Sequence, residues 1–69
     1  MSEQTRAHEA AGVAHMRRAV ELLQQAIEAA EHGDYKDASG LLRGETKDRV
    51  YFAEIEMRLA EQAAKREKP

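Results

Sequence analysis

The histidines of this sequence, with the carboxylates beside them, are the residues most suited to metal binding or proton transfer. His8-Glu9 begins like the zinc-protease helix motif, but Gly12 stands where a second His is needed four residues on. The Glu-x-x-His pairs of di-iron helical bundles are missing too. His8 and His15 lie two helical turns apart, about 10 Å, which is too far to chelate one ion from the same helix. We therefore predict no metal site and no cofactor, and the role of His8 and His15 stays open.

Nucleophilic catalysis has little to build on. The chain contains no Cys, and neither Ser2 nor Ser39 has a His at a convincing helical spacing. Gly40 and Gly44 lack the flanking strand and the Lys of a phosphate-binding loop. The sequence therefore predicts a protein that is not an enzyme and has no catalytic residues.

A long helix over about residues 4–32 is the strongest structural signal. Large apolar residues recur at alternating steps of three and four, the heptad spacing of a helix that packs against another helix. They are Val13, Met16, Val20, Leu23 and Ile27, followed by Ala30. Beside them, Gly12, Ala19 and Ala26 recur every seven residues. A line of such small side chains lets a neighbouring backbone approach closely.

The ends of this helix carry recognisable signals. Ser2 or Thr5 can cap its start, and Gly33 can end it in a left-handed conformation. Asp34 then opens the next helix, with Asp37 in the first turn, where the helix dipole favours an acidic side chain. We therefore expect an antiparallel turn at Gly33-Asp34.

The second segment, about residues 35–66, is less regular. Gly44-Glu45-Thr46 is typical of a helix end followed by a new cap at Thr46. A break near Gly44 gives helices at 35–43 and 46–66, and the alternative is one kinked helix. The expected fold is all-α, either a helical hairpin or a three-helix arrangement, in a single domain over residues 1–69. The charged tail at about 65–69 is expected to fray.

Two apolar stripes run along residues 50–64. The first contains Phe52, Ile55, Leu59 and Ala63, and the second contains Val50, Ala53, Met57, Ala60 and Ala64. Because the larger side chains should pack together, we expect Phe52 and Leu59 to face Val20, Leu23 and Ile27 within the chain. Glu56 falls between the stripes, either at the rim of a contact or buried with a partner.

The stretch LLQQAIEAAEHGDYKDASGLL, residues 22–42, resembles the helix-turn-helix of tetratricopeptide repeats. Ala26, Gly33, Tyr35 and Ala38 match its small residue, its Gly-x-Tyr turn and the Ala three residues after the Tyr. The stretch is also similar to the first two helices of microtubule-interacting-and-transport domains. The resemblance implies a helical adaptor that binds other proteins. It departs from both families after Gly44, and no second copy of the repeat follows.

The core expected from this composition is small. Thirteen apolar residues are Ala, and without Cys no disulfide can stabilise so short a chain. We therefore expect a homo-oligomer, a dimer or higher, that acts as a protein–protein interaction or assembly module and assembles into a helical bundle. The expected oligomer interface combines the second stripe of the second segment with the small-residue line of the first. Its residues are Val50, Ala53, Met57, Ala60, Ala64, Gly12, Ala19 and Ala26.

A small helical RNA- or DNA-binding regulator is the alternative. Its phosphate contacts would be Arg17, Arg18, Arg43, Lys47 and Arg49. The net charge of −2 offers no broad attraction for nucleic acid or for an anionic membrane. Because no long apolar run and no apolar signal core occur, a cytoplasmic protein is expected.

Overall fold

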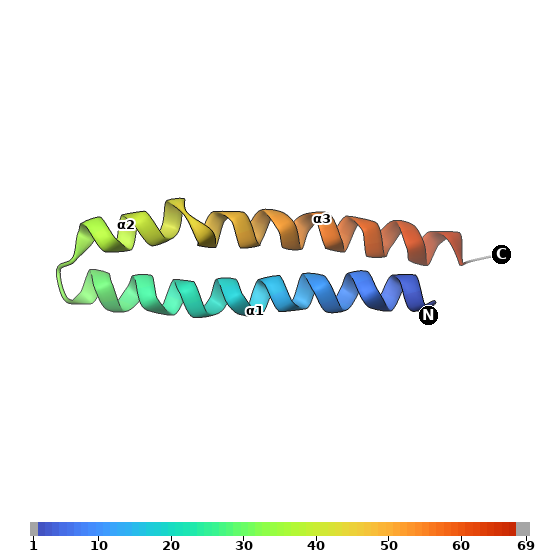
Figure 1. Cartoon of the computed structure of the whole chain (residues 1–69), viewed down its shortest axis with the longest axis horizontal. Helices are drawn as coiled ribbons and strands as arrows, with labels where there is room; N and C mark the ends of the chain where they lie inside the picture. The colour runs from blue at the N-terminus through green and yellow to red at the C-terminus, as the bar shows by residue number, and fades with distance from the viewer. Residues whose placement is uncertain (1, 68–69) are drawn as a thin grey trace.

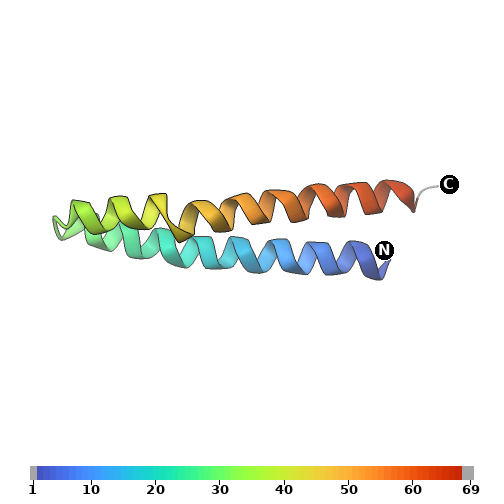
Figure 2. The same cartoon turned by 45° about the horizontal axis from the view of Figure 1, so that its top comes forward.

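The computed structural model describes residues 2–67, which form two antiparallel helical arms (Figure 1). The first arm is α1, Glu3–Glu31. The second arm consists of α2, Tyr35–Arg43, and α3, Glu45–Arg66. The arms stay side by side in both views and measure 55 × 14 × 12 Å together (Figures 1 and 2). The expected all-α hairpin, with its long first helix, is confirmed.

The turn between the arms forms where its residues predict it. The Ser2 hydroxyl accepts a hydrogen bond from the Thr5 amide at 3.2 Å and caps α1. Gly33 has a φ of +79°, the left-handed conformation that ends the helix. The Asp34 carboxylate accepts from the Asp37 amide at 3.1 Å and opens α2.

The second arm bends at Gly44, as Figure 2 shows in yellow. Gly44 separates the two helices with φ −93° and ψ −119°, and its amide donates to the Gly40 carbonyl at 3.0 Å. The predicted break is therefore confirmed. The predicted cap at Thr46 is wrong, because α3 begins at Glu45 and no side chain caps it. Thr46 is instead buried in the first turn of α3, and its hydroxyl has no hydrogen-bond partner there.

Small side chains bring the arms together. On α1 the buried ones are Thr5, Gly12, Ala19 and Ala26, at steps of seven residues, and on α3 they are Thr46, Ala53 and Ala63. A Cβ added to Gly12 would fall on the end of Met57, 3.3 Å from Glu56 Cβ and 3.6 Å from the Ala53 carbonyl oxygen. The absence of a side chain at Gly12 therefore permits this close helix contact.

The core within one chain is correspondingly slight. Among residues 2–67, Leu22 is the one large apolar side chain that is buried, at 2% exposed. The other buried apolar residues are alanines. The expected core of Phe52 and Leu59 with Val20, Leu23 and Ile27 does not form, because all five side chains are 37–58% exposed. Phe52 lies instead beside His15, with 5.6 Å between the ring centroids.

Candidate interaction surface

The hairpin presents two long faces, on opposite sides of the line where its arms touch. Each residue of a helix is rotated by about 100° about the axis from the residue before it. One side of the buried small residues of α1 therefore carries Met16, Val20, Leu23 and Ile27. His15, Arg18 and Leu22 lie on the other side. We call the first the heptad face and the second the histidine face.

Contacts between the arms assign the second arm to these faces. Phe52 lies on the histidine face, because its ring contacts His15. An ion pair at 3.2 Å between Arg18 Nε and Glu45 Oε2 places the start of α3 on the same face. Ile55 and Leu59 follow Phe52 at helical spacing and lie on this face too. Met57 and Val50 lie across the buried Ala53 from Phe52, and Met57 reaches toward Gly12. They belong to the heptad face.

The bend at Gly44 requires a separate assignment for α2. Leu41 lines a shallow hollow together with Gln25 and Ala29, which lie on the histidine side of α1. Leu42 therefore projects on the opposite side of the buried Ala38, toward the heptad face. With this assignment, the heptad face consists of Val13, Met16, Val20, Leu23, Ile27, Leu42, Val50 and Met57.

Polar contacts between the arms are concentrated on the histidine face. His8 Nδ1 and Glu56 Oε2 are 3.0 Å apart, and both side chains are about three-quarters buried. Glu56 is thus a carboxylate with a partner, one of the two possibilities that its position left open. Arg49 donates from a guanidinium nitrogen to His15 Nδ1 at 3.0 Å, a contact in which Nδ1 must be unprotonated.

Charge on this face centres on Glu45. Its carboxylate accepts hydrogen bonds from Arg18 at 3.2 Å and from Arg49 at 3.3 Å, while Arg18 also reaches Glu21. The hydrogen bond from Arg18 is the main cause that lowers the pKa of Glu45 below its usual value, and the same contact raises the pKa of Arg18. This ion cluster joins α1 to the start of α3.

The heptad face is apolar and open. Val20 and Ile27 are 53% and 58% exposed. The other exposed side chains of this face are Met16, Leu23, Leu42 and Val50. The polar contacts between the arms that the structure describes lie on the histidine face or, for Ser2 and Thr5 with Glu67, at the open end of the hairpin. The heptad spacing predicted for α1 is thus present, but its large side chains from Met16 to Ile27 remain 40–58% exposed in the hairpin.

The structure corrects part of the expected oligomer interface. Gly12, Ala19, Ala26 and Ala53 are buried between the two arms of one chain, so they are not available to a second copy. The small-residue line of α1 and the second stripe of α3 were predicted to form a contact between chains, but that line and Ala53 of the stripe are buried within one chain instead. Of the other residues proposed for that interface, Val50 is exposed, whereas Met57, Ala60 and Ala64 are partly buried.

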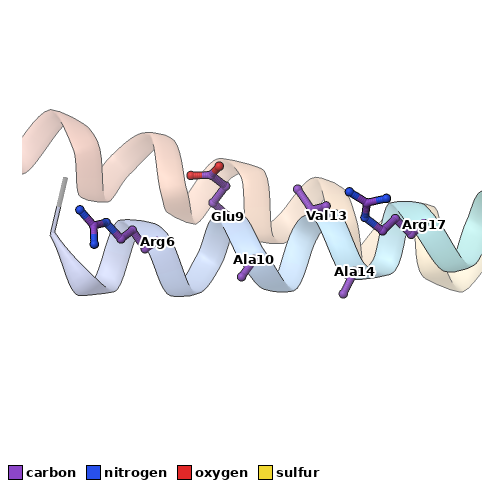
Figure 3. Close-up of a pocket in the computed structure, with 6 residues that line it drawn as sticks. All are labelled: Arg6, Glu9, Ala10, Val13, Ala14 and Arg17. Atoms are coloured by element: carbon purple, nitrogen blue, oxygen red, sulfur yellow. The ribbon is translucent and has the colours of Figure 1, made fainter.

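The basic residues considered for nucleic acid are divided between ion pairs and free surface. Arg18 and Arg49 both contact Glu45. Arg17 lies with Arg6 beside a shallow hollow on α1 (Figure 3). The hollow is lined by Arg6, Glu9, Ala10, Val13, Ala14 and Arg17.

The described residues lack two further features, a cluster of metal-ligating side chains and a helix that could cross a membrane. Within residues 2–67, no group of three or more His, Asp or Glu side chains is placed to hold a metal ion. None of the three helices combines the length and the apolar character that crossing a bilayer requires.

Comparison with known proteins gives no family for this hairpin. No family model, no curated protein and no solved structure matches the chain. The class that the fold defines is therefore an all-α helical hairpin, and arguments about function rest on its own surfaces.

The paired polar residues were the part of the surface that sequence reasoning missed. His8 with Glu56, and His15 with Arg49, were considered one at a time. A signal that pairs them was available, because small residues recur every seven positions in both arms. Aligning Gly12 with Ala53 in antiparallel order also brings His8 near Glu56 and His15 near Arg49.

Proposed function

We propose that this protein is a non-catalytic helical assembly module that acts as an oligomer. The observation that carries the proposal is the imbalance between buried and exposed apolar side chains. Eleven large apolar side chains are exposed, whereas Leu22 is the one classed as buried in the described chain. Single exposed apolar residues are ordinary, but a contiguous row of them marks an interaction surface.

The total surface supports the same proposal. The chain exposes 5302 Å², whereas a compact monomer of 7.8 kDa is expected to expose about 4,400 Å². The excess of about 900 Å² is close to the roughly 800 Å² that each partner buries in a standard protein interface. Association would therefore bring the exposed area to the value expected for a chain of this mass.

The nucleic-acid alternative has less support. Arg18 and Arg49 would have to leave the Glu45 carboxylate to contact phosphates, and the net charge is −2. Binding driven by phosphate contacts also weakens steeply with salt. The apolar surface, by contrast, calls for a partner with an apolar surface of its own.

Sedimentation equilibrium on the purified chain tests this proposal. We expect a dimer or larger species at tens of micromolar, with an association that is retained in 0.5 M NaCl because burial of apolar surface drives it. A chain that stays monomeric and helical at that concentration would refute the oligomeric function.

A further inference from the structure

We propose that the heptad face docks a second copy of this chain, through antiparallel pairing of the two α1 helices about Val20. The proposal rests on the oligomeric function proposed above and specifies its interface. The heptad spacing of Met16, Val20, Leu23 and Ile27 is the pattern by which one helix packs against another. Because α3 uses the small-residue line of α1 instead, this second pattern remains for a helix outside the chain.

The angle between the two patterns fits a four-helix bundle. On α1 the small-residue line and the heptad residues are separated by about 80°, close to a quarter of a turn. In a bundle of four helices, each helix contacts two neighbours in directions roughly a quarter-turn apart. In the proposed dimer, α3 of the same chain is one neighbour of α1, and α1 of the second copy is the other.

The heptad face is also arranged symmetrically, as a two-fold contact requires. Val13 and Ile27 are equidistant from Val20 along α1, so a two-fold axis at Val20 brings Val13 of one copy against Ile27 of the other. On the second arm, the contacts of Gly12 with Ala53 and of Arg18 with Glu45 place Val20 level with about residues 43–45.

Leu42 and Val50 lie on opposite sides of that level, Val50 further from it, and both are exposed in the single chain. The same axis places the second arm of one copy antiparallel to the second arm of the other. The excess surface of about 900 Å² is close to what one partner of a dimer buries. Together with the symmetric spacing of Val13, Val20 and Ile27, this excess is the reason to place a second copy, rather than an unrelated helix, on this face.

The histidine face is a poorer docking surface, although Phe52, Ile55 and Leu59 are partly exposed there. The Arg18–Glu45–Arg49 cluster lies across it at the level of the bend. A second chain over this cluster would remove charged groups from water, and their mutual attraction would not fully offset that desolvation. On the heptad face, the contact between the two α1 helices covers an apolar row, Met16, Val20, Leu23 and Ile27.

Cross-linking of single-cysteine variants tests the register, because the chain has no Cys of its own. A short bis-maleimide should link Val20→Cys into a covalent dimer in high yield. In the proposed pairing, the two copies of residue 27 are about 20 Å apart along the helices. Ile27→Cys should therefore link poorly, and so should Phe52→Cys on the histidine face. Efficient linking at Phe52→Cys alone, or equal linking at positions 20 and 27, would overturn the proposed contact.

A charge substitution tests the face independently. Val20→Glu should keep the helical circular dichroism of the wild type but weaken dimerisation at least about 100-fold, because the axis would bring two carboxylates together in an apolar contact. Ile55→Glu, on the histidine face, is the matched control and should remain dimeric.

The outcomes separate this inference from the oligomeric function. An oligomer that withstands Val20→Glu but is dissociated by Ile55→Glu would overturn the docking face and leave the oligomeric function in place. A monomeric wild type would overturn both, and the heptad face would then be assigned to a different helix.

Discussion

Leu22 and Thr46 show how narrow the contact between the arms is at the scale of single residues. Leu22 is the large side chain that the contact buries, and Thr46 places a hydroxyl in the same contact with no partner for it. The first stabilises the hairpin by removing apolar surface from water. The second loses hydration without a compensating hydrogen bond.

Replacing Leu22 should therefore have a large effect. Leu22→Ala is expected to lower the free energy of unfolding by about 2–5 kcal/mol, through lost burial and the cavity left behind. The matched control is Leu59→Ala, since Leu59 is 37% exposed and should lose less than about 2 kcal/mol. Urea denaturation followed by circular dichroism measures both variants, and equal losses would contradict this description of the core.

Thr46→Val should act in the opposite direction. The substitution keeps the branched shape and removes the unpaired hydroxyl, so we expect a gain of about 1 kcal/mol in the free energy of unfolding. Thr5 is also buried, but its hydroxyl donates to Glu67 at 3.1 Å. Thr5→Val should therefore be destabilising. Thermal melts of the two variants would contradict the argument if both shifted in the same direction.

At the scale of elements, the turn and the bend have different requirements. Gly33 needs its left-handed conformation, whereas Gly40 lies within α2 and has open space around it. Gly33→Ala should therefore cost roughly 1 kcal/mol, and Gly40→Ala should add about 0.5–1 kcal/mol by favouring the helix. Chemical denaturation of the pair checks the contrast, which would fail if Gly33→Ala were as stable as the wild type.

The start of α3 is joined to α1 by a contact that depends on pH. The pKa of Glu45 is lower in the folded chain than its ordinary value. Its contribution to stability is therefore present above the unfolded pKa and is lost as the pH falls through the folded pKa. Glu45→Gln should be less stable than the wild type at pH 7, and the difference should shrink below about pH 4.5. Urea midpoints at matched concentration measure this, and a difference that grew in acid would refute it.

At the scale of the whole molecule, the hairpin is a rod that exposes more surface than its mass predicts. In the proposed oligomer, association would cover part of that surface only in the folded state, so stability should depend on protein concentration. A hundredfold increase should raise the melting temperature by at least about 5 °C. Calorimetry or circular dichroism over that range measures it. Val20→Glu supplies the control, and a melting temperature independent of concentration in the wild type would count against assembly.

Most of the helical framework was predictable from the sequence because its signals are local. Gly33 ends α1, Asp34 caps α2 and Gly44 interrupts the second arm, each through the conformation of its own backbone or a bond to a near neighbour. The heptad row and the small-residue lines are likewise properties of single helices. The exception was Thr46, whose side chain turned toward the other arm instead of capping its own helix.

Tertiary structure alone decided which of these rows meet. Periodicity fixes where a residue lies around its own helix, but it does not fix how that helix is rotated against its neighbour. Each arm carries both a small-residue line and a row of large side chains, so more than one pairing was available. The small lines met because Gly12, Ala19 and Ala53 let the backbones approach closely along the length of the hairpin. That choice left Val20 and Ile27 exposed on one side and moved Phe52 to the other.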